Sequence, residues 1–219
     1  MSKQPQTAAK RPRPRFYLVT PEVAGADAFA GSLVPALGAA DIAAVLLRLA
    51  PADERTLINR VKALAPIVQQ KDVALVLDGH PEIVARGGAD GAHLSGVETF
   101  IAALEGLKPA RIAGCGDLHT RHDAMLAGER GADYVLFGEP DAHGRRPAFE
   151  AIVERIAWWA EILEIPCVGF AGSRDEIAPL VAAGADFIAV GDFIWADARG
   201  PAAALADATQ RLALPEEVA

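Results

Sequence analysis

The feature that most constrains the fold of this chain is a repeated Gly-Ala-Asp followed by an apolar run. Three close copies are GGADGAHL at 87–94, RGADYVLFG at 130–138 and AGADFIAVG at 183–191, and a looser copy, GAADIAAVL, occupies 38–46. Each repeat suits the junction between a helix and a buried strand. Gly ends the helix in a left-handed conformation, Ala fits a tight turn, and Asp bonds nearby backbone amides. We therefore interpret Asp90, Asp133 and Asp186 as structural residues at the amino ends of strands, not as catalytic acids.

Short apolar runs alternate with longer amphipathic segments along most of the chain. The predicted strands cover 16–20, 42–48, 73–78, 91–94, 110–116, 133–138, 166–172 and 186–192, and the helical segments include 53–70, 119–130, 147–163 and 173–183. Apolar strands separated by helices indicate a parallel sheet covered by helices. Eight such units predict an α/β protein with a single-domain (β/α)8 TIM barrel over residues 15–213. For the helical segment at 119–130 we predict that Asp117 is the cap. For the segment at 173–183 we predict a capping box of Ser173 and Glu176.

The two ends of the chain and its composition restrict location and partners. Residues 1–14 are basic and proline-containing, which predicts a disordered tail, with a nucleic-acid or membrane contact as the alternative; residues 214–219 are a short C-terminal tail. The net charge of −8 argues against nucleic acid as the main partner, and no apolar stretch is long enough for a membrane span. Cys115 and Cys167 lie in apolar runs, which favours a reduced, cytoplasmic protein. Trp158 and Trp159 face either the core or a subunit contact, so a homo-oligomer is left open.

In a barrel of this type, function lies at the carboxyl ends of the strands. Two stretches there suit phosphate. Gly172 and Ser173 begin a helix, where free amides favour an anion, and the loop after the eighth strand, with Gly191 and Asp192, adjoins them. The second stretch is HGRRP at 143–147, whose paired arginines suit a diphosphate. A plain capped turn and a solvated charged loop are the respective structural alternatives.

Several framework motifs carry a family resemblance. They are FYLVT at 16–20, VLLR at 45–48, GADGAHL at 88–94, the Gly-x-x-His-Thr turn at 116–120, GADYVLFG at 131–138, IPCVGFAGS at 165–173 and GADFIAVGDFI at 184–194. On these motifs the chain resembles thiamine phosphate synthase and its relative, the thiazole tautomerase TenI, over about residues 15–197. The resemblance implies a barrel that binds a thiazole phosphate beside the last two strands. It also implies a pyrimidine diphosphate with Mg²⁺ at the mouth.

The chain departs from the synthase pattern at the mouth. Arg48 is kept on the second strand, but Leu46 and Ala50 replace the family's glutamine and lysine. The third strand ends Asp78-Gly79 in place of Asn-Asp, and Asp117 replaces a diphosphate-binding serine. The Thr-x-Thr-Lys loop becomes His143-Gly144-Arg145-Arg146, Glu98 keeps the second metal carboxylate, and Glu139 stands where the tautomerase has a histidine.

The resemblance assigns roles to these residues. We expect the catalytic residues to be Arg48, Glu139 and His119. The residues expected to bind substrate or phosphate are His143, Arg145, Arg146, Gly172, Ser173, Gly191 and Asp192. The residues expected to hold magnesium are Asp78, Glu98 and Asp117. The first reading is a synthase that joins hydroxymethylpyrimidine diphosphate to thiazole phosphate and needs Mg²⁺. The alternatives are a metal-free thiazole tautomerase with Glu139 moving the proton, a non-catalytic binder of a phosphorylated ligand, or another barrel enzyme of phosphorylated substrates. His93 is interpreted as a satisfied interior residue.

Overall fold

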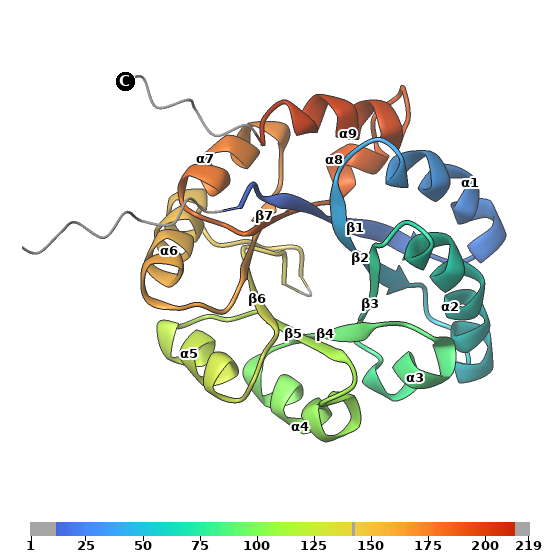
Figure 1. The fold of residues 1–219 in the computed structure, drawn as a ribbon, viewed down its shortest axis with the longest axis horizontal. Coiled ribbons are helices and arrows are strands. Elements are labelled where there is room, and N and C mark those ends of the chain that lie inside the picture. The colour runs from blue at the N-terminus through green and yellow to red at the C-terminus, as the bar shows by residue number, and fades with distance from the viewer. Residues whose placement is uncertain (1–11, 142, 213–219) are drawn as a thin grey trace, which may run out of the picture.

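The protein forms a closed barrel of eight parallel strands in sequence order, with β8 pairing back to β1. The computed structural model describes residues 12–141 and 143–212. The strands are β1 Arg15–Val23, β2 Ile42–Leu49, β3 Ala74–Asp78, β4 Gly91–Ser95, β5 Ile112–Gly116, β6 Tyr134–Phe137, β7 Cys167–Ala171 and β8 Phe187–Val190. Helices surround the strands on the outside (Figure 1). The predicted (β/α)8 barrel is confirmed, and each predicted strand coincides with an observed one.

The helices follow the strands and cover the outer face of the barrel. They are α1 Ala26–Leu37, α2 Glu54–Gln69, α3 Val84–Gly87, α4 Val97–Leu107, α5 Arg121–Glu129, α6 Phe149–Ile162, α7 Ile177–Ala182, α8 Asp192–Trp195 and α9 Pro201–Thr209, with 3₁₀ turns η1 Pro81–Ile83 and η2 Arg174–Glu176. Within the described residues, no helix has the length and apolarity needed to cross a bilayer. Of the predicted tails, residues 12–14 form no helix or strand, and 1–11 and 214–219 lie outside the described residues.

Two predicted sets of capping bonds are wrong, although Ser173 does stand at the predicted N-cap position. Thr120, not Asp117, caps α5, because its side chain accepts the N–H of Asp123 while the Asp123 carboxylate accepts the N–H of Thr120. The side chain of Ser173 makes no capping bond. Glu176 instead accepts the N–H of Gly172, at 2.7 Å, so the predicted capping box is absent from this turn.

The repeated Gly-Ala-Asp ties each helix end to the neighbouring strand. Gly88, Gly131 and Gly184 have φ of 79°, 90° and 97°, the left-handed conformation predicted for the glycines. The carboxylates of Asp90, Asp133 and Asp186 accept backbone N–H groups of Leu75, Ala113 and Cys167, at 2.7, 2.7 and 2.8 Å. The N–H of each Asp donates to the carbonyl of that same strand residue. The repeat is therefore a two-point clamp between strands, and its structural interpretation is confirmed.

Two apolar cores lie on the two faces of the barrel wall. The larger core packs between the strands and the helices and includes Phe16, Leu18 and Trp159, all fully buried. The smaller core fills the barrel itself, with Tyr17, Val19, Ala44, Leu46, Val76, Tyr134, Leu136, Val168 and Ala189. Successive residues of a strand alternate between these cores, as the pleat of a strand requires. Two tyrosine hydroxyls thereby enter an otherwise apolar interior.

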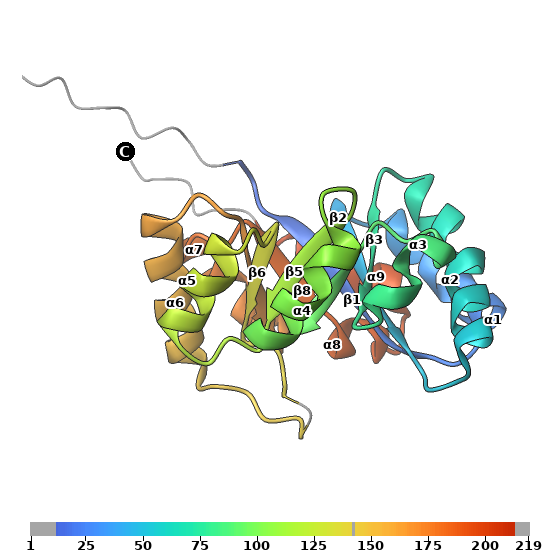
Figure 2. The same ribbon diagram turned by 90° about the horizontal axis from the view of Figure 1, so that it is seen from below.

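Parallel strands bring all eight carboxyl ends to one face, the mouth of the barrel. The loop between β6 and α6 projects from this face, below the body of the barrel in Figure 2. The Asp clamps lie at the opposite, amino-terminal ends of the strands. The fold therefore separates the repeated acids from the acids that face the mouth.

Candidate active site at the barrel mouth

Two adjoining cavities open at the mouth, and they share Leu136, Glu139 and Asp141. The larger, here called the mouth cavity, has a volume of about 540 Å³ and is lined by residues that include Arg48, Asp78, His93, Glu139, Phe170, Gly191 and Asp192. The smaller, the side cavity, has a volume of about 310 Å³ and is lined by residues that include Asp117, His119, Glu139, Arg145, Arg146 and Arg155. The structure thus divides most of the predicted site residues between two spaces, and Glu139 borders both, whereas Glu98, His143, Gly172 and Ser173 line neither.

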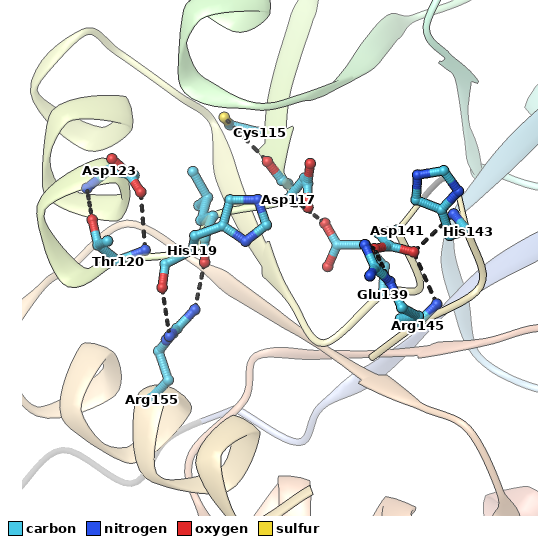
Figure 3. A network of polar contacts seen from close by, with 12 residues as sticks. Cys115, Asp117, His119, Thr120, Asp123, Glu139, Asp141, His143, Arg145 and Arg155 are labelled. Carbon is cyan, nitrogen blue, oxygen red and sulfur yellow. Dashed lines mark hydrogen bonds and ion pairs between the residues drawn. The ribbon is translucent and has the colours of Figure 1, made fainter. Parts of the chain in front are cut away.

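Glu139 lies at the junction of the two cavities, two residues after the end of β6. Its carboxylate accepts the backbone N–H of Asp117 from the end of the adjacent β5 (Figure 3). Asp117 has a left-handed backbone, with φ of 51°, which is uncommon outside glycine. Burial raises the pKa of Glu139 to about 7, and the nearby carboxylates of Asp117 and Asp78 add to this rise. Glu139 can therefore exchange a proton near neutral pH.

Arg48 reaches the mouth cavity from the end of β2. Its backbone N–H donates to the hydroxyl of Thr20, at 3.0 Å, which fixes its strand against β1. The Arg48 guanidinium forms an ion pair with Asp78, with 3.6 Å between Nε and Oδ2. About a third of each side chain is exposed, so the guanidinium can turn toward an anion in the cavity.

The β6–α6 loop is organised around the carboxylate of Asp141. This carboxylate accepts the backbone N–H groups of His143 and Arg145 and also pairs with the Arg145 guanidinium, at 2.9 Å. These bonds lower the pKa of Asp141 to about 2. The side chain of Arg145 is 75% exposed, so this loop presents one guanidinium to solvent at the cavity rim.

Arg146 is engaged with the protein itself. Its guanidinium donates to the carbonyls of Gly138 and Phe170, at 2.7 and 2.8 Å, and pairs with Glu176, at 3.1 Å. Glu176 in turn occupies the amide of Gly172. At the predicted phosphate site after β7, the Gly172 N–H therefore donates to the carboxylate of Glu176, whereas the prediction had it donating to a phosphate. Ser173 and Gly172 line neither cavity, whereas Gly191 and Asp192 line the mouth cavity.

The three acids predicted to hold magnesium are not gathered in this structure. Asp78 pairs with Arg48, and Asp117 lies 3.4 Å from His119. Glu98 is exposed at the start of α4 and lines neither cavity. Among residues 12–141 and 143–212, no group of three His, Cys, Asp or Glu side chains is placed to hold a metal. The donor set therefore does not fit a metal site made by the protein alone.

His119 and the loop that carries it are held from the helix side. The Arg155 guanidinium on α6 donates to the carbonyls of Leu118 and His119, the latter at 2.9 Å (Figure 3). The His119 side chain itself is 75% exposed, so it can move toward a ligand in the side cavity. Arg155 was not among the predicted residues, and nothing in its helical setting distinguishes it from a surface arginine.

Sequence reasoning also missed the part of His93 and Phe170 in the mouth cavity. His93 was correctly interpreted as an interior residue, with 3% exposure, but its ring forms part of the cavity wall. Burial lowers its pKa, so the ring is neutral at physiological pH. The available signal was the position of His93 near the carboxyl end of β4, on the strand face that points into the barrel.

A (β/α)8 barrel with a polar, arginine-bearing mouth defines a class of enzymes that act on small molecules at that face. Residues 16–194 match the thiamine monophosphate synthase family, and the chain belongs to this family. It is 44% identical to the thiamine-phosphate synthase of Rhodospirillum centenum, over 88% of this chain and 95% of that protein. The thiamine-phosphate synthase of Hyphomonas neptunium is 36% identical, over 91% and 94%. The resemblance inferred from the motifs is thus confirmed.

Solved structures agree on the fold. The thiamine phosphate pyrophosphorylase of Pyrococcus furiosus superposes with a TM-score of 0.74 at 21% identity, covering 91% of this chain and 96% of that one. The 3-hexulose-6-phosphate synthase of Salmonella typhimurium has a TM-score of 0.70 at 16% identity, covering 90% and 98%. At such identities the likeness shows the barrel fold and no more.

Proposed function

We propose that the protein is a thiamine-phosphate synthase, which joins hydroxymethylpyrimidine diphosphate to thiazole phosphate and releases diphosphate. The observation that carries this is the 44% identity to a thiamine-phosphate synthase over nearly the whole barrel. The mouth cavity supports it, because its volume and its arginine suit small phosphorylated substrates.

The reaction breaks the bond between the pyrimidine methylene carbon and the diphosphate oxygen, and the thiazole nitrogen then bonds to that carbon. The protein must stabilise the leaving anion, stabilise the transient cation and exclude water. Arg48 and Arg145 are the guanidinium groups best able to receive the diphosphate, since Arg146 is engaged by two carbonyls and Glu176. The ionised form of Glu139, at the junction of the cavities, would stabilise the cation.

Product formation tests this function directly. Purified protein is incubated with both substrates, and thiamine phosphate is quantified by chromatography after conversion to fluorescent thiochrome. We expect Arg48→Ala to lower kcat by about 10²–10³-fold, the usual loss when one donor to a developing anion is removed. Arg55→Ala, an exposed position on α2, is the matched control and should keep full activity. No product from the unaltered protein would contradict the proposal.

A magnesium requirement stays a prediction, and no step above depends on a metal. Because the three predicted acids do not meet, any ion would need oxygens from the diphosphate as well. Chelation with EDTA and re-addition of Mg²⁺ tests the requirement. Glu98→Ala should abolish magnesium-dependent turnover if Glu98 is a ligand, and unchanged turnover would remove Glu98 from the mechanism.

A second candidate, thiazole tautomerase, is favoured by Glu139. A carboxylate with a pKa of about 7 beside a cavity suits proton transfer, and it stands at the position of the tautomerase histidine. Glu139→Gln should then stop tautomerisation while thiazole phosphate still binds, as measured by calorimetry with and without Mg²⁺. A retained rate in Glu139→Gln would rule out this base. Binding of thiazole phosphate without any turnover would favour the non-catalytic binder.

The remaining expectations concern the setting of the protein. The cytoplasmic location, the possible homo-oligomer and the exclusion of nucleic acid as the main partner stay predictions. Light scattering coupled to size-exclusion chromatography measures the oligomeric state of the full chain.

A further inference from the structure

A chain of three polar side chains crosses the apolar interior of the barrel. The hydroxyls of Tyr17 on β1 and Tyr134 on β6 are 2.6 Å apart, and the Tyr134 hydroxyl lies 3.1 Å from Nδ1 of His93 on β4. All three residues are buried, and the His93 ring stacks on the Tyr134 ring. An apolar interior favours hydrocarbon side chains, because burying a polar group costs free energy unless the group is hydrogen-bonded. The presence of three linked polar groups there therefore calls for an explanation.

Two glycines on β5 make room for this chain. A Cβ on Gly114 would stand 2.3 Å from the Tyr134 hydroxyl, and one on Gly116 would stand 2.5 Å from Nε2 of His93 and 2.1 Å from Oε1 of Glu139. Residues 114 and 116 lie on the same face of the strand, the face that points into the barrel. The end of the chain at Nε2 of His93 is therefore a neighbour of the Glu139 carboxylate, in the space that a side chain at 116 would fill.

The hydrogen bonds in this chain have one direction that satisfies every hydroxyl. If Tyr17 donates to Tyr134 and Tyr134 donates to Nδ1 of His93, each hydroxyl hydrogen has an acceptor. In the reverse direction the Tyr17 hydroxyl hydrogen is buried without an acceptor among the described residues, which is costly. The first direction leaves Nδ1 without a hydrogen. Because the ring is neutral, its hydrogen is then on Nε2, at the cavity floor.

We propose that His93 is a positioning residue for Glu139, locked by Tyr134 in the tautomer that carries hydrogen on Nε2. Nε2 of His93 borders, from the barrel interior, the same space beside Gly116 that Oε1 of Glu139 borders, with no direct hydrogen bond between the two, while the N–H of Asp117 donates to that carboxylate from the end of β5. A hydrogen on Nε2 puts partial positive charge beside this shared space, which favours one orientation of the Glu139 carboxylate at the junction of the two cavities. The effect on catalysis rests on the proposed function, whereas the tautomer does not.

Nitrogen-15 NMR of histidine-labelled protein tests the tautomer without any activity assay. Long-range proton–nitrogen correlations report which ring nitrogen carries hydrogen. The chain has five histidines, and the signals of His93 are identified by their absence from His93→Asn. We expect hydrogen on Nε2 in the unaltered protein and in Tyr17→Phe, which keeps the Tyr134–His93 bond. We expect a mixture of tautomers in Tyr134→Phe. Hydrogen on Nδ1 in the unaltered protein would overturn the proposal.

Kinetics of the same variants separate positioning from stability. Tyr134→Phe should lower kcat about tenfold with little change in KM, as expected for losing one orienting hydrogen bond, and Tyr17→Phe should lower it less than about twofold. His93→Asn retains a side-chain amide near the Nδ1 position but has no Nε2–H, so it should resemble Tyr134→Phe. Thermal unfolding confirms that each variant folds.

Equal losses of kcat in Tyr17→Phe and Tyr134→Phe would mean a packing role only. If the unaltered protein makes no thiamine phosphate yet shows the expected tautomer, the proposed function fails and this inference stands.

Discussion

The carboxylate of Glu139 differs from two other acids of the protein, Asp141 and Asp197, in the direction in which its surroundings shift its pKa. The side chains of Asp141 and Asp197 are 24% and 13% exposed, and hydrogen bonds from backbone amides and guanidinium groups lower their pKa to about 2. Burial of the Glu139 carboxylate, with two other carboxylates nearby, outweighs its hydrogen bonds from the backbone, so its pKa moves in the opposite direction. At the scale of single residues, burial and neighbouring charge thus decide which acid can exchange a proton.

This difference predicts a pH-dependent stability. The pKa of Glu139 is about 7 in the folded protein and near 4.5 in the unfolded chain. Between these values the unfolded chain has lost the proton that the folded protein keeps, so the stability present below pH 4.5 declines as the pH rises toward 7. Relative to Glu139→Gln, the unaltered protein should lose roughly 2–3 kcal/mol across this window. Urea unfolding at a series of pH values measures the loss.

The control for this prediction is Glu129→Gln, which replaces an exposed glutamate at the end of α5. Its stability should follow that of the unaltered protein at every pH. A constant difference between the unaltered protein and Glu139→Gln from pH 4.5 to 7 would contradict the raised pKa of Glu139.

At the scale of elements, short contacts at strand ends decide how loops meet. The Asp clamps join helix ends to strands at the amino face, and Arg155 joins α6 to the β5–α5 loop at the mouth. Both contacts satisfy backbone groups that would otherwise be left without partners near the barrel wall. The clamps therefore contribute to stability, and the Arg155 contact contributes to the shape of the site.

The Asp90 clamp gives a stability prediction. Asp90→Ala removes the acceptor of the Leu75 N–H and of the Gln69 side-chain amide, so the free energy of unfolding should fall by about 1–3 kcal/mol. Asp90→Asn keeps an acceptor oxygen and should lose less. Urea unfolding of both variants measures the difference, and equal losses would show that the carboxylate charge, not the hydrogen bond, matters.

The Arg155 contact gives an activity prediction. Arg155→Met releases the carbonyls of Leu118 and His119, which frees the loop that aims the Asp117 N–H at Glu139. We expect kcat/KM of the proposed reaction to fall about tenfold, equal to about 1.4 kcal/mol of barrier. The control is Arg121→Met, whose guanidinium on α5 lies over the Trp158 ring of α6 at 4.8 Å, a different contact with the same helix. Activity unchanged in Arg155→Met would show that the loop holds its shape without this arginine.

At the scale of the whole molecule, the mouth cavity is lined from strands or loops on nearly every side of the barrel. A ligand in this cavity contacts the folded barrel and finds no equivalent site in the unfolded chain. Thiazole phosphate at 100 times its Kd should therefore stabilise the protein by about 2.7 kcal/mol. Urea unfolding with and without ligand measures the shift. No shift at concentrations that saturate the protein in calorimetry would place the ligand outside the folded barrel.

The sequence by itself determined the barrel, because the fold rests on local patterns. Gly88, Gly131 and Gly184 end helices, the Asp of each repeat bonds the preceding strand, and apolar runs of strand length recur eight times. The motifs also identified the family correctly. The helix caps did not follow from the sequence, since Thr120 and Asp117 are both of residue types that cap helices and only the backbone path selects Thr120.

Only the tertiary structure decided how the mouth residues pair. Glu98 and Asp117 have the same chemistry, yet one is exposed away from both cavities and the other bonds Glu139. Arg145 and Arg146 are adjacent, but one faces solvent and the other bonds Gly138 of its own loop, Phe170 of β7 and Glu176 of η2. These contacts join residues far apart in the chain, and a side chain's direction at a strand end changes with a shift of one residue. Local pattern therefore sets the scaffold, and long-range geometry sets the site.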